Sequence, residues 1–516
     1  MYPGTHAATT PDKPAVIMAG SSEVVTYAEL DDESRRLAVA LHDLGLRKGD
    51  VVAMLSDNAA ECFTIYWAAL RSGLYLTAIN SHLTPAEAAY IAEDCDAKVL
   101  ISSGRLGDLA ERVRELVPQI AHAYSFGGDL EGHSAYADLL ASAGDRELEE
   151  QPRGSDMLYS SGTTGRPKGV KPPLLPLTVD QPGDPLTGLA AQAFGFGDTD
   201  VYLSPAPIYH AAPLRWSGVV HALGGTVVVM EKFSALEALA AVEKYQVTIT
   251  QMVPTMFVRL LQLDDIERLA CDTSSLRLAI HAAAPCPQEV KQAMIDWWGP
   301  ILLEYYSSTE SSGLTLITSQ EWVTKRGSVG RSMFGPVHVC DEDGRELSAG
   351  EIGLLYFERD VRPFEYHKDP EKTAKAEHPD HPNWTTVGDV GYVDDDGYVY
   401  LTDRKSFMII SGGVNIYPQE AENALTLHPA VFDVAVIGVP DPVMGQQVKA
   451  VVQLRKGFTP GPELAEELLD HARSKVAAFK APRTIDFVET LPRTETGKLV
   501  KGRLVEQYAA ASEVSA

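Results

Sequence analysis

The chain has 516 residues, more than one ordinary domain holds, so two or more domains are expected. Hydrophobic residues make up 45% of the chain and charged residues 22%, which is typical of a folded globular protein. The net charge of −27 argues against nucleic acid or an anionic membrane as the main partner, while local basic residues still allow a small anionic ligand.

The five cysteines are scattered and form no C-x-x-C pair, which disfavours a zinc site and a disulfide framework. The N-terminus shows no basic segment followed by an apolar run, so no signal peptide is expected. An apolar stretch of about 20 residues is also missing, which predicts no transmembrane segment. Together these features favour a cytoplasmic location. The absence of a G-x-S-x-G elbow disfavours a serine hydrolase.

Helix and strand patterns alternate over the first 300 or so residues of the chain. Thr26 and Glu29 form a capping box that predicts a helix through Leu44. Continuous apolar runs predict buried strands, and a further helical pattern covers residues 59–72. The predicted strands are 51–55, 98–101, 226–230, 247–250 and 276–280. This alternation predicts an α/β fold with helix-covered parallel sheets.

The pattern changes after Glu310, where segments become short, extended and rich in turns. Residues 391–401 are two strand-like runs around an acidic turn, which predicts a hairpin. We therefore expect a large domain at 1–403 that ends in a β-rich subdomain at about 311–403. Residues 404–516 are expected to form a small, mobile α+β domain. Its predicted helices are 418–427 and about 463–476, and its predicted strands are 434–439 and 448–454.

The segment YSSGTTGRPKGV at 159–170 combines hydroxyl side chains, glycines and Lys168. Glycines let a backbone approach a ligand closely, while hydroxyls, amides and an ammonium group suit the oxygens of a polyphosphate. The standard loop G-x-x-x-x-G-K-[ST] is absent, because Pro167 replaces its second glycine and Gly169 follows the lysine. Taken alone, the segment could also be a flexible turn. Residues 171–188 contain five prolines and are expected to form an exposed loop.

Four more polar clusters follow along the chain. The segment EYYSSTE at 304–310 follows an apolar strand, where open α/β sheets bind ligands, and its carboxylate suits Mg²⁺. Asp389 lies beside two glycines and could accept hydrogen bonds from a ribose. Residues 403–420 join a basic pair to a double-glycine loop, and residues 492–498 end in Lys498. Taken alone, residues 304–310 are more often a polar loop with a solvated Glu, Asp389 is more often a turn aspartate, and Lys498 is more often a solvated lysine.

In this order, the five motifs closely resemble the acyl-CoA synthetases of the adenylate-forming superfamily, which includes firefly luciferase and the adenylation domains of peptide synthetases. The resemblance covers nearly the whole chain. It implies that ATP and a carboxylic acid give an acyl-adenylate and pyrophosphate, and that the thiol of CoA then gives the thioester and AMP. The implied cofactors are ATP, Mg²⁺ and CoA. The expected partners are these small molecules and no nucleic acid, and a homo-oligomer is left open.

The resemblance also implies a role for each motif. The phosphate loop would hold the β- and γ-phosphates through Ser160, Ser161, Gly162, Thr163, Thr164, Gly165 and Lys168. The walls of the nucleotide site would be Ala283, Ala284, Pro285, Glu304, Tyr305, Tyr306 and Ser307, with Tyr306 against the adenine. The ribose hydroxyls would bind Asp389 and Arg404.

Charge stabilisation in the first step would come from Thr309 near the α-phosphate, from Glu310 through Mg²⁺, and from Lys498 between the carboxylate and the α-phosphate. In the second step, rotation of the small domain would bring Gly412 and Gly413 to the pantetheine channel. The sequence departs from the family at Ser406, where most relatives have Asp or Lys at the hinge, and that leaves the hinge mechanics open. The family's T-G-D motif also reads V-G-D in this chain, at residues 387–389.

The acyl pocket in this family begins at a segment that here contains Tyr209, His210, Arg215 and Trp216. His210 resembles a gate or carboxylate neighbour, and a core or loop histidine is the alternative. The following residues contain no Asp, which argues against an α-amino acid substrate. Segments 281–287 and 297–300 resemble synthetases for long or bulky alicyclic acids. We therefore expect a bulky polycyclic acid or a medium- to long-chain fatty acid, and an aryl acid second.

Two alternatives to a CoA ligase remain at this stage. A ligase that loads a carrier protein meets the same pantetheine thiol, so these motifs do not separate it from a CoA ligase. A non-catalytic paralogue that binds a nucleotide or acyl-CoA is disfavoured, because a sensor would have little need for Lys498.

Overall fold

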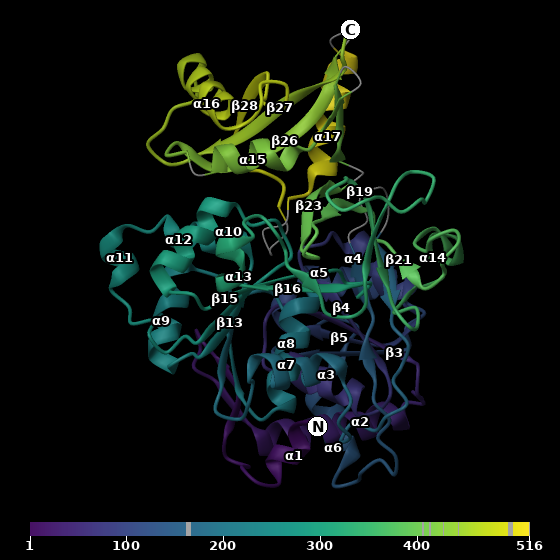
Figure 1. Ribbon diagram of the computed structural model, residues 1–516. Helices are drawn as coiled ribbons and strands as arrows, with labels where there is room; N and C mark the ends of the chain where they lie inside the picture. Colours follow the sequence, from purple (N-terminus) through teal and green to yellow (C-terminus); the bar gives the residue numbers. More distant parts are fainter. Residues whose placement is uncertain are drawn as a thin grey trace. The chain divides into compact units, whose positions relative to one another are not determined.

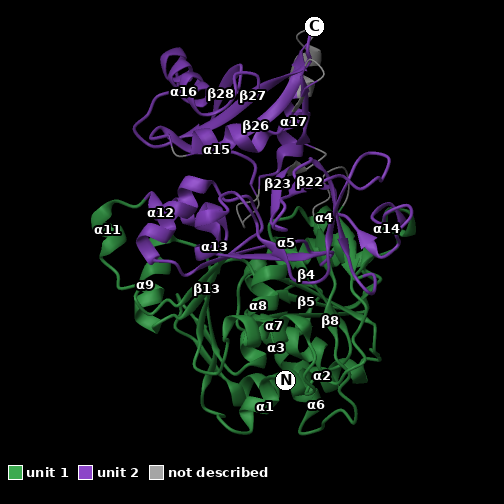
Figure 2. Cartoon of the chain, viewed as in Figure 1, with its two compact units in different colours: residues 1–252, 263–280, 363–373 green, residues 253–262, 281–362, 374–516 purple. Residues whose placement is uncertain are grey.

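The computed structural model describes residues 1–160, 167–404, 407–411, 414–426, 428–441, 443–493 and 499–514 (Figure 1). The chain forms two compact units (Figure 2). Unit 1 contains residues 1–252, 263–280 and 363–373, and unit 2 contains residues 253–262, 281–362 and 374–516. The boundary predicted between residues 403 and 404 falls inside unit 2 and stays a prediction.

Unit 1 contains a fully parallel sheet in the order β7-β6-β5-β3-β4-β8. Its strands are β3 (Val51–Ser56), β4 (Tyr75–Asn80), β5 (Ala97–Ser103), β6 (His122–Phe126), β7 (Ser134–Ala135) and β8 (Ser155–Asp156). The accompanying helices are α2 (Tyr27–Asp43), α3 (Glu61–Leu70), α4 (Pro85–Asp94), α5 (Asp108–Leu116) and α6 (Tyr136–Ala143). Every residue of β3 is buried, as expected for a parallel strand covered on both faces. The predicted helix-covered parallel sheet is confirmed.

A second set of strands in unit 1 runs in the order β13-β11-β12-β1-β2. These strands are β1 (Pro14–Met18), β2 (Val24–Thr26), β11 (Val201–Ser204), β12 (Thr226–Val229) and β13 (Ile249–Met252). Strands β1, β11, β12 and β13 pair in parallel, and β2 adds an antiparallel edge. The helices in these chain segments are α1 (Pro3–Ala7), α7 (Pro185–Phe194), α8 (Ala211–Ala222), α9 (Ala235–Tyr245) and α11 (Asp265–Leu269). The predicted strands at 226–230 and 247–250 are thus confirmed as β12 and β13.

The prediction of an exposed loop over residues 171–188 is wrong at both ends. Strand β10 (Lys168–Lys171) extends to Lys171, and helix α7 begins at Pro185. The carboxylate of Asp184 caps α7 by accepting a hydrogen bond of 2.8 Å from the amide of Thr187. Val179 between them is 1% exposed, and its carbonyl accepts a hydrogen bond from the N-terminal amino group. The proline content of residues 171–188 predicts irregular backbone, but it does not show that tertiary packing buries part of this segment.

Unit 2 contains the antiparallel strands β15 (Leu302–Ser307), β16 (Leu314–Thr318) and β17 (Arg331–Ser332). A second antiparallel sheet has the order β18-β19-β22-β23, with β21 (Trp384–Thr385) beside β19. Its main strands are β18 (Val337–Cys340), β19 (Gly353–Glu358), β22 (Asp389–Val393) and β23 (Val399–Arg404). Tyr392 of β22 pairs with Tyr400 of β23, which confirms the predicted hairpin. Helices α10 (Pro254–Leu261), α12 (Gln288–Trp298) and α13 (Ser319–Thr324) lie in the same unit.

The C-terminal part of unit 2 is an α+β structure with strands in the order β25-β24-β27-β26 and β28 parallel to β27. The strands are β24 (Ile409–Ser411), β25 (Val414–Ile416), β26 (Val431–Asp441), β27 (Gly445–Leu454) and β28 (Thr484–Val488). The helices are α15 (Pro418–Thr426), α16 (Pro462–Lys475) and α17 (Lys501–Val514). Alternate apolar residues of β26 and β27 pack with α15 and α16 into one core. The predicted helices and strands of this region are therefore confirmed.

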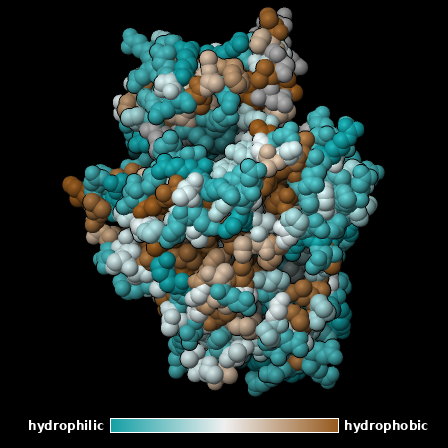
Figure 3. Space-filling view, in the orientation of Figure 1, coloured by the Kyte–Doolittle hydropathy of each residue, from teal (hydrophilic) through white to brown (hydrophobic). Residues whose placement is uncertain are grey.

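The visible surface is mostly hydrophilic, with scattered hydrophobic patches (Figure 3). One of them lies where α11 is drawn in Figure 1, and two apolar residues of that helix, Ile266 and Leu269, are 85% and 65% exposed. No helix in the described ranges has the length and apolar character that crossing a membrane requires.

Candidate active site

The stem of the predicted phosphate loop is a short antiparallel hairpin in unit 1. Strand β9 (Leu158–Ser160) pairs with β10, so that Ser160 lies opposite Lys168 and Leu158 opposite Val170. Strand β20 (Glu365–Tyr366) pairs with the other edge of β10. The two predicted residues that are described here, Ser160 and Lys168, therefore stand on either side of the loop's opening. Ser161, Gly162, Thr163, Thr164 and Gly165 lie outside the described residues.

The ammonium group of Lys168 forms an ion pair with Asp369, with Nζ 2.7 Å from Oδ2. The side chain of Lys168 is 31% exposed and that of Asp369 is 24% exposed. The hydrogen bond from Lys168 lowers the pKa of Asp369, and the same bond raises the pKa of Lys168. The ion pair keeps both groups charged next to a loop suited to anions.

Strand β15 carries the predicted nucleotide residues Glu304, Tyr305, Tyr306 and Ser307 in unit 2. Its residues alternate in direction, so Glu304 and Tyr306 lie on the face opposite to Tyr305 and Ser307. The hydroxyl of Tyr306 donates a hydrogen bond of 2.5 Å to Oδ2 of Asp389. Ser307 Oγ donates to the carbonyl oxygen of Gly313 at 2.7 Å. The structure thus brings the predicted adenine residue and the predicted ribose residue into direct contact.

Asp389 and Arg404 are cross-strand partners at the end of the β22–β23 pair. The preceding turn depends on Gly388, whose φ of +86° is a conformation that side-chain-bearing residues rarely adopt. Asp389 itself is 7% exposed. The backbone therefore places both predicted ribose ligands at one end of the sheet, although they are 15 positions apart in the sequence.

Thr309 and Glu310 lie in the turn that joins β15 to β16. The turn is closed by a hydrogen bond of 3.0 Å from the Ser311 amide to the Ser308 carbonyl, and Ser311 has a φ of +54°. The carboxylate-bearing residue Glu310 is 8% exposed. Two hydroxyl oxygens in the same turn, Ser308 Oγ and Ser312 Oγ, are buried and have no hydrogen-bond partner among the described residues. Buried oxygen atoms without partners are costly, and a bound phosphate or hydrated Mg²⁺ would satisfy them.

The second predicted wall, at Ala283, Ala284 and Pro285, follows β14 (Leu278–His281). Ala283 has a φ of +74°, which is strained for a residue that carries a Cβ atom. Such strain is common at ligand-binding turns, so the geometry is compatible with a wall that approaches a planar ligand.

Glu304 has a structural partner that the sequence did not reveal. Lys291 of α12 donates a hydrogen bond of 2.5 Å to Glu304 Oε2, and its side chain is only 1% exposed. His281 Nε2 lies 3.8 Å from the same oxygen, and burial together with Lys291 lowers the pKa of His281 well below its usual value. Burial also raises the pKa of Glu304, and the charge of Lys291 opposes this shift. The carboxylate of Glu304 therefore ties β15 to α12, two residues before Tyr306.

The residues predicted for the acyl pocket surround the start of α8 in unit 1. Arg215 is held by Asp156, with Nη2 2.7 Å from Oδ2 and Nε 3.1 Å from Oδ1. Trp216 is 4% exposed, and its ring centroid lies 5.5 Å from that of Phe196. Tyr209 is 7% exposed, and the ring of His210 lies 4.5 Å from it. Arg215 and Trp216 therefore have defined packing partners, and His210 lies at the N-cap of α8.

The segment that contains Lys498 has a described stem. Arg493 and Leu499 form an antiparallel bridge, and the amide of Val500 donates to the carbonyl of Pro492 at 2.8 Å. Arg493 also holds Asp433, with Nη2 2.6 Å from Oδ1. Lys498 itself lies outside the described residues, as do Gly412, Gly413 and the predicted hinge residue Ser406.

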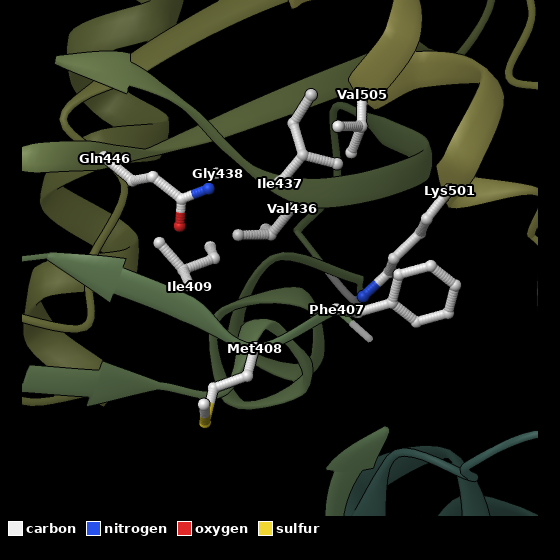
Figure 4. A pocket seen from close by; sticks show the side chains of 9 residues that line it. All are labelled: Phe407, Met408, Ile409, Val436, Ile437, Gly438, Gln446, Lys501 and Val505. Atoms are coloured by element: carbon white, nitrogen blue, oxygen red, sulfur yellow. The ribbon is translucent and has the colours of Figure 1, made fainter. Parts of the chain in front are cut away.

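A small pocket lies in the C-terminal part of unit 2 (Figure 4). Its lining residues are Phe407, Met408, Ile409, Val436, Ile437, Gly438, Gln446, Lys501 and Val505. Lys501 Nζ is 2.9 Å from Glu422 Oε1, and this oxygen also accepts a hydrogen bond of 2.7 Å from the Val436 amide. Lys501 is thus a buried structural lysine, three positions after the predicted catalytic lysine.

The structure adds Lys291 and Asp369 to the residues around the predicted motifs. No sequence signal marked them, because Lys291 lies on an ordinary amphipathic helix and Asp369 is 201 positions from Lys168. Among the described residues, no cluster of His, Cys, Asp and Glu suited to a metal ion occurs, and the described cysteines are free thiols. This is compatible with a Mg²⁺ ion that is held mainly by phosphate oxygens and one carboxylate.

The fold and these paired motifs define an adenylate-forming enzyme. The family model described as "AMP-binding enzyme" matches residues 4–360, and the model described as "AMP-binding enzyme C-terminal domain" matches residues 420–498. The chain therefore belongs to the AMP-binding enzyme family, within the class of AMP-forming acyl-CoA synthetases.

Two curated relatives illustrate the similarity in sequence. The long-chain-fatty-acid–CoA ligase FadD13 of Mycobacterium tuberculosis is 32% identical, with 98% of this chain and 97% of the relative covered. A 3-[(3aS,4S,7aS)-7a-methyl-1,5-dioxo-octahydro-1H-inden-4-yl]propanoyl:CoA ligase of Rhodococcus jostii is 33% identical, with 94% of each chain covered.

A solved structure illustrates the similarity in fold. The anthranilate CoA ligase AuaEII in complex with anthranoyl-AMP superposes with a TM-score of 0.83 and 27% identity, over 99% of this chain and 98% of that chain. The predicted architecture, a large N-terminal domain of sheets and helices followed by a smaller C-terminal domain, is thereby confirmed.

Proposed function

We propose that the chain is an ATP-dependent carboxylic acid–CoA ligase. It joins the acid to AMP with release of pyrophosphate, and then transfers the acyl group from AMP to the thiol of CoA. The observation that carries this proposal is the contact between Tyr306 and Asp389, with Arg404 opposite Asp389 on the next strand. An aromatic ring fixed to a carboxylate at a strand end suits the adenine and ribose of one nucleotide.

Each predicted group has a defined task in the first step. Lys168 and the hydroxyl-rich loop after Ser160 neutralise the β- and γ-phosphates and hold the leaving pyrophosphate. Glu310 holds Mg²⁺, and Thr309 binds the α-phosphate. The buried hydroxyls of Ser308 and Ser312 give this turn unused hydrogen-bonding capacity, which supports the proposal.

Lys498 stabilises the charge that develops between the carboxylate of the acid and the α-phosphate. It acts as an electrostatic group and not as a nucleophile, because the acid itself attacks phosphorus. The bridge between Arg493 and Leu499 supports this task by fixing both ends of the short segment that carries Lys498. In the second step, the same C-terminal part presents Gly412 and Gly413 to the pantetheine arm of CoA.

The proposed substrate is a bulky polycyclic acid or a medium- to long-chain fatty acid. The similarity to FadD13 and to the Rhodococcus ligase supports this choice, since their names specify a long-chain fatty acid and a bicyclic propanoate. An aryl acid is the second candidate, because AuaEII is named for anthranilate. Tyr209, His210, Arg215 and Trp216 form the beginning of the acyl pocket, with His210 beside the reacting carboxylate.

The test is ATP–pyrophosphate exchange with a panel of single acids, followed by thioester formation on added CoA. The panel contains steroid-derived acids, medium- and long-chain fatty acids, aryl acids, acetate and amino acids. The proposal expects exchange with an acid of the first two groups and thioester formation after CoA is added. Exchange without thioester formation would instead support a ligase that loads a carrier protein. Absence of exchange with every acid would overturn the proposal.

The proposed setting is the cytoplasm, where ATP and CoA are available and where five reduced cysteines would be stable. Small molecules are the proposed partners, without a role for nucleic acid.

A further inference from the structure

Lys168 and Asp369 are the starting point for an inference that rests on the proposed function. Lys168 is the cation of the proposed phosphate loop, and its ammonium group is bonded to Asp369 Oδ2 at 2.7 Å. A phosphate that binds Lys168 competes with this carboxylate, because both anions accept hydrogen bonds from the same ammonium group. The position of Asp369 is therefore that of a competitor for phosphate.

Asp369 is held in place by several bonds that do not involve Lys168. Its second carboxylate oxygen accepts a hydrogen bond of 3.0 Å from the amide of Lys372, at the start of α14 (Pro370–Lys375). Its carbonyl accepts a hydrogen bond of 2.9 Å from Thr373 Oγ1, and its amide donates to the carbonyl of Tyr366 at 3.1 Å. The carboxylate therefore stays in place when its partner leaves.

The backbone of Lys168 is fixed in a similar way. It pairs with Ser160 across β9–β10, and Gly169 next to it accepts a hydrogen bond of 2.8 Å from the amide of His367. Only the long side chain of Lys168 is able to move, and it is 31% exposed. The side chain of Lys168 is thus able to move, while strand β10, which carries it, is paired on both edges. The fixed carboxylate of Asp369 lies at hydrogen-bonding distance from its ammonium group.

We propose that Asp369 is an internal stand-in for phosphate, which holds Lys168 in the ligand-free enzyme and takes it back when pyrophosphate leaves. Binding of ATP exchanges one carboxylate–ammonium contact for a phosphate–ammonium contact. Release of pyrophosphate reverses the exchange, so Lys168 never has to face solvent without a partner. Asp369 is a positioning residue in this scheme, because it acts through Lys168 and does not touch the reacting atoms.

The carboxylate of Asp369 lowers the affinity of the enzyme for every ligand phosphate that Lys168 binds. Removing its charge should therefore tighten pyrophosphate binding, and slow its release, at the same time. Because the ion pair is partly exposed, the expected change is modest, about two- to fivefold. A purely structural role for Asp369 predicts the opposite, since loss of order in the loop would weaken the binding of phosphates.

The test variant is Asp369→Asn, which removes the charge and keeps an oxygen that is able to cap α14. Binding of inorganic pyrophosphate is measured by titration calorimetry, and pyrophosphate inhibition and the KM for ATP are measured in the exchange assay. The control variant is Glu365→Gln, which removes an equal charge from β20, opposite Lys171. We expect Asp369→Asn to bind pyrophosphate about two- to fivefold more tightly and to have a lower KM for ATP, and Glu365→Gln to resemble the wild type.

A second comparison isolates the role of Lys168. In a Lys168→Met background, Asp369→Asn should no longer change pyrophosphate binding, because the group for which the two anions compete is gone. Unchanged or weaker pyrophosphate binding in the single variant would overturn the inference, and so would an equal effect of Asp369→Asn with and without Lys168→Met. The exchange assay on the wild type distinguishes failure of this inference from failure of the proposed function. If the wild type catalyses exchange but Asp369→Asn has no effect, only the role of Asp369 is overturned.

Discussion

The hydroxyl of Tyr306 donates a hydrogen bond of 2.5 Å to Oδ2 of Asp389, although 83 residues separate the two in the chain. The bond joins strand β15 to strand β22 through their side chains. In the proposed function, this arrangement fixes the aromatic ring and the ribose-binding carboxylate in one geometry before ATP arrives. Such preorganisation reduces the cost of ordering the site during binding.

Tyr306→Phe tests this preorganisation. The ring is kept while the hydrogen bond is lost, so we expect the KM for ATP to rise by about three- to tenfold, in line with about 1 kcal/mol for a typical intramolecular hydrogen bond. The kcat should change less. Tyr392→Phe is the matched control, because its ring stacks on Tyr400 at 4.7 Å within the same unit. An equal rise in KM for both variants would contradict the assignment.

Substitution of Lys498 is predicted to reduce catalysis, and substitution of Lys501 is predicted to reduce stability. Lys498→Ala should reduce the rate of ATP–pyrophosphate exchange by about 100-fold or more, because an electrostatic contact of the transition state is lost. Its unfolding midpoint should stay close to that of the wild type. Lys501→Met should instead lower the unfolding midpoint, because it leaves the buried carboxylate of Glu422 without its ion-pair partner. Thermal unfolding and exchange assays on both variants check this, and a catalytic loss confined to Lys501→Met would contradict it.

Lys291→Met is predicted to destabilise unit 2. Glu304 would keep its carboxylate in a site that is nearly closed to solvent, and the loss of a buried partner costs about 3–5 kcal/mol. The double variant Lys291→Met/Glu304→Leu should recover most of this loss, because no charge remains buried. Chemical unfolding of the two variants and the wild type measures the difference. A double variant as unstable as the single one would show that packing, and not charge pairing, is decisive.

His221 is predicted to make stability depend on pH. It is fully buried, and burial lowers its pKa from 6.5 to about 3. Trp67 donates to Nδ1 at 3.2 Å, so Nε2 carries the proton and donates to the carbonyl of Ala15 at 3.1 Å. Below pH 6.5, His221 binds a proton in the unfolded chain but not in the folded chain. The contribution of His221 to the free energy of unfolding therefore falls as the pH decreases towards 3.

The loss from His221 should reach about 1.4 kcal/mol per pH unit once the pH is well below 6.5. This loss is measured from the unfolding midpoints of the wild type and of His221→Gln at a series of pH values, from about pH 7.5 to about pH 4.5 in steps of about one unit. The variant should be less stable at neutral pH and should lose stability less steeply on acidification. Parallel curves for the two proteins would contradict the assignment.

Much of the fold followed from local patterns in the sequence. The capping box of Thr26 and Glu29 forms as predicted, because both hydrogen bonds lie within one turn of chain. The hairpin of β22 and β23 and the long strands β26 and β27 were also predicted, since alternating or continuous apolar residues mark them directly. The prediction over residues 171–188 was wrong because burial of Val179 depends on distant packing and not on proline content.

The sequence by itself determined the class of fold, the family and the order of its motifs, because these depend on periodicity, capping and residue types that are close along the chain. Only the tertiary structure decided which side chains meet. It placed Asp369 on Lys168, Lys291 on Glu304, and Tyr306 on Asp389, across separations of 201, 13 and 83 residues. Contacts of this kind follow from how strands and helices pack, and local sequence patterns carry no record of that packing.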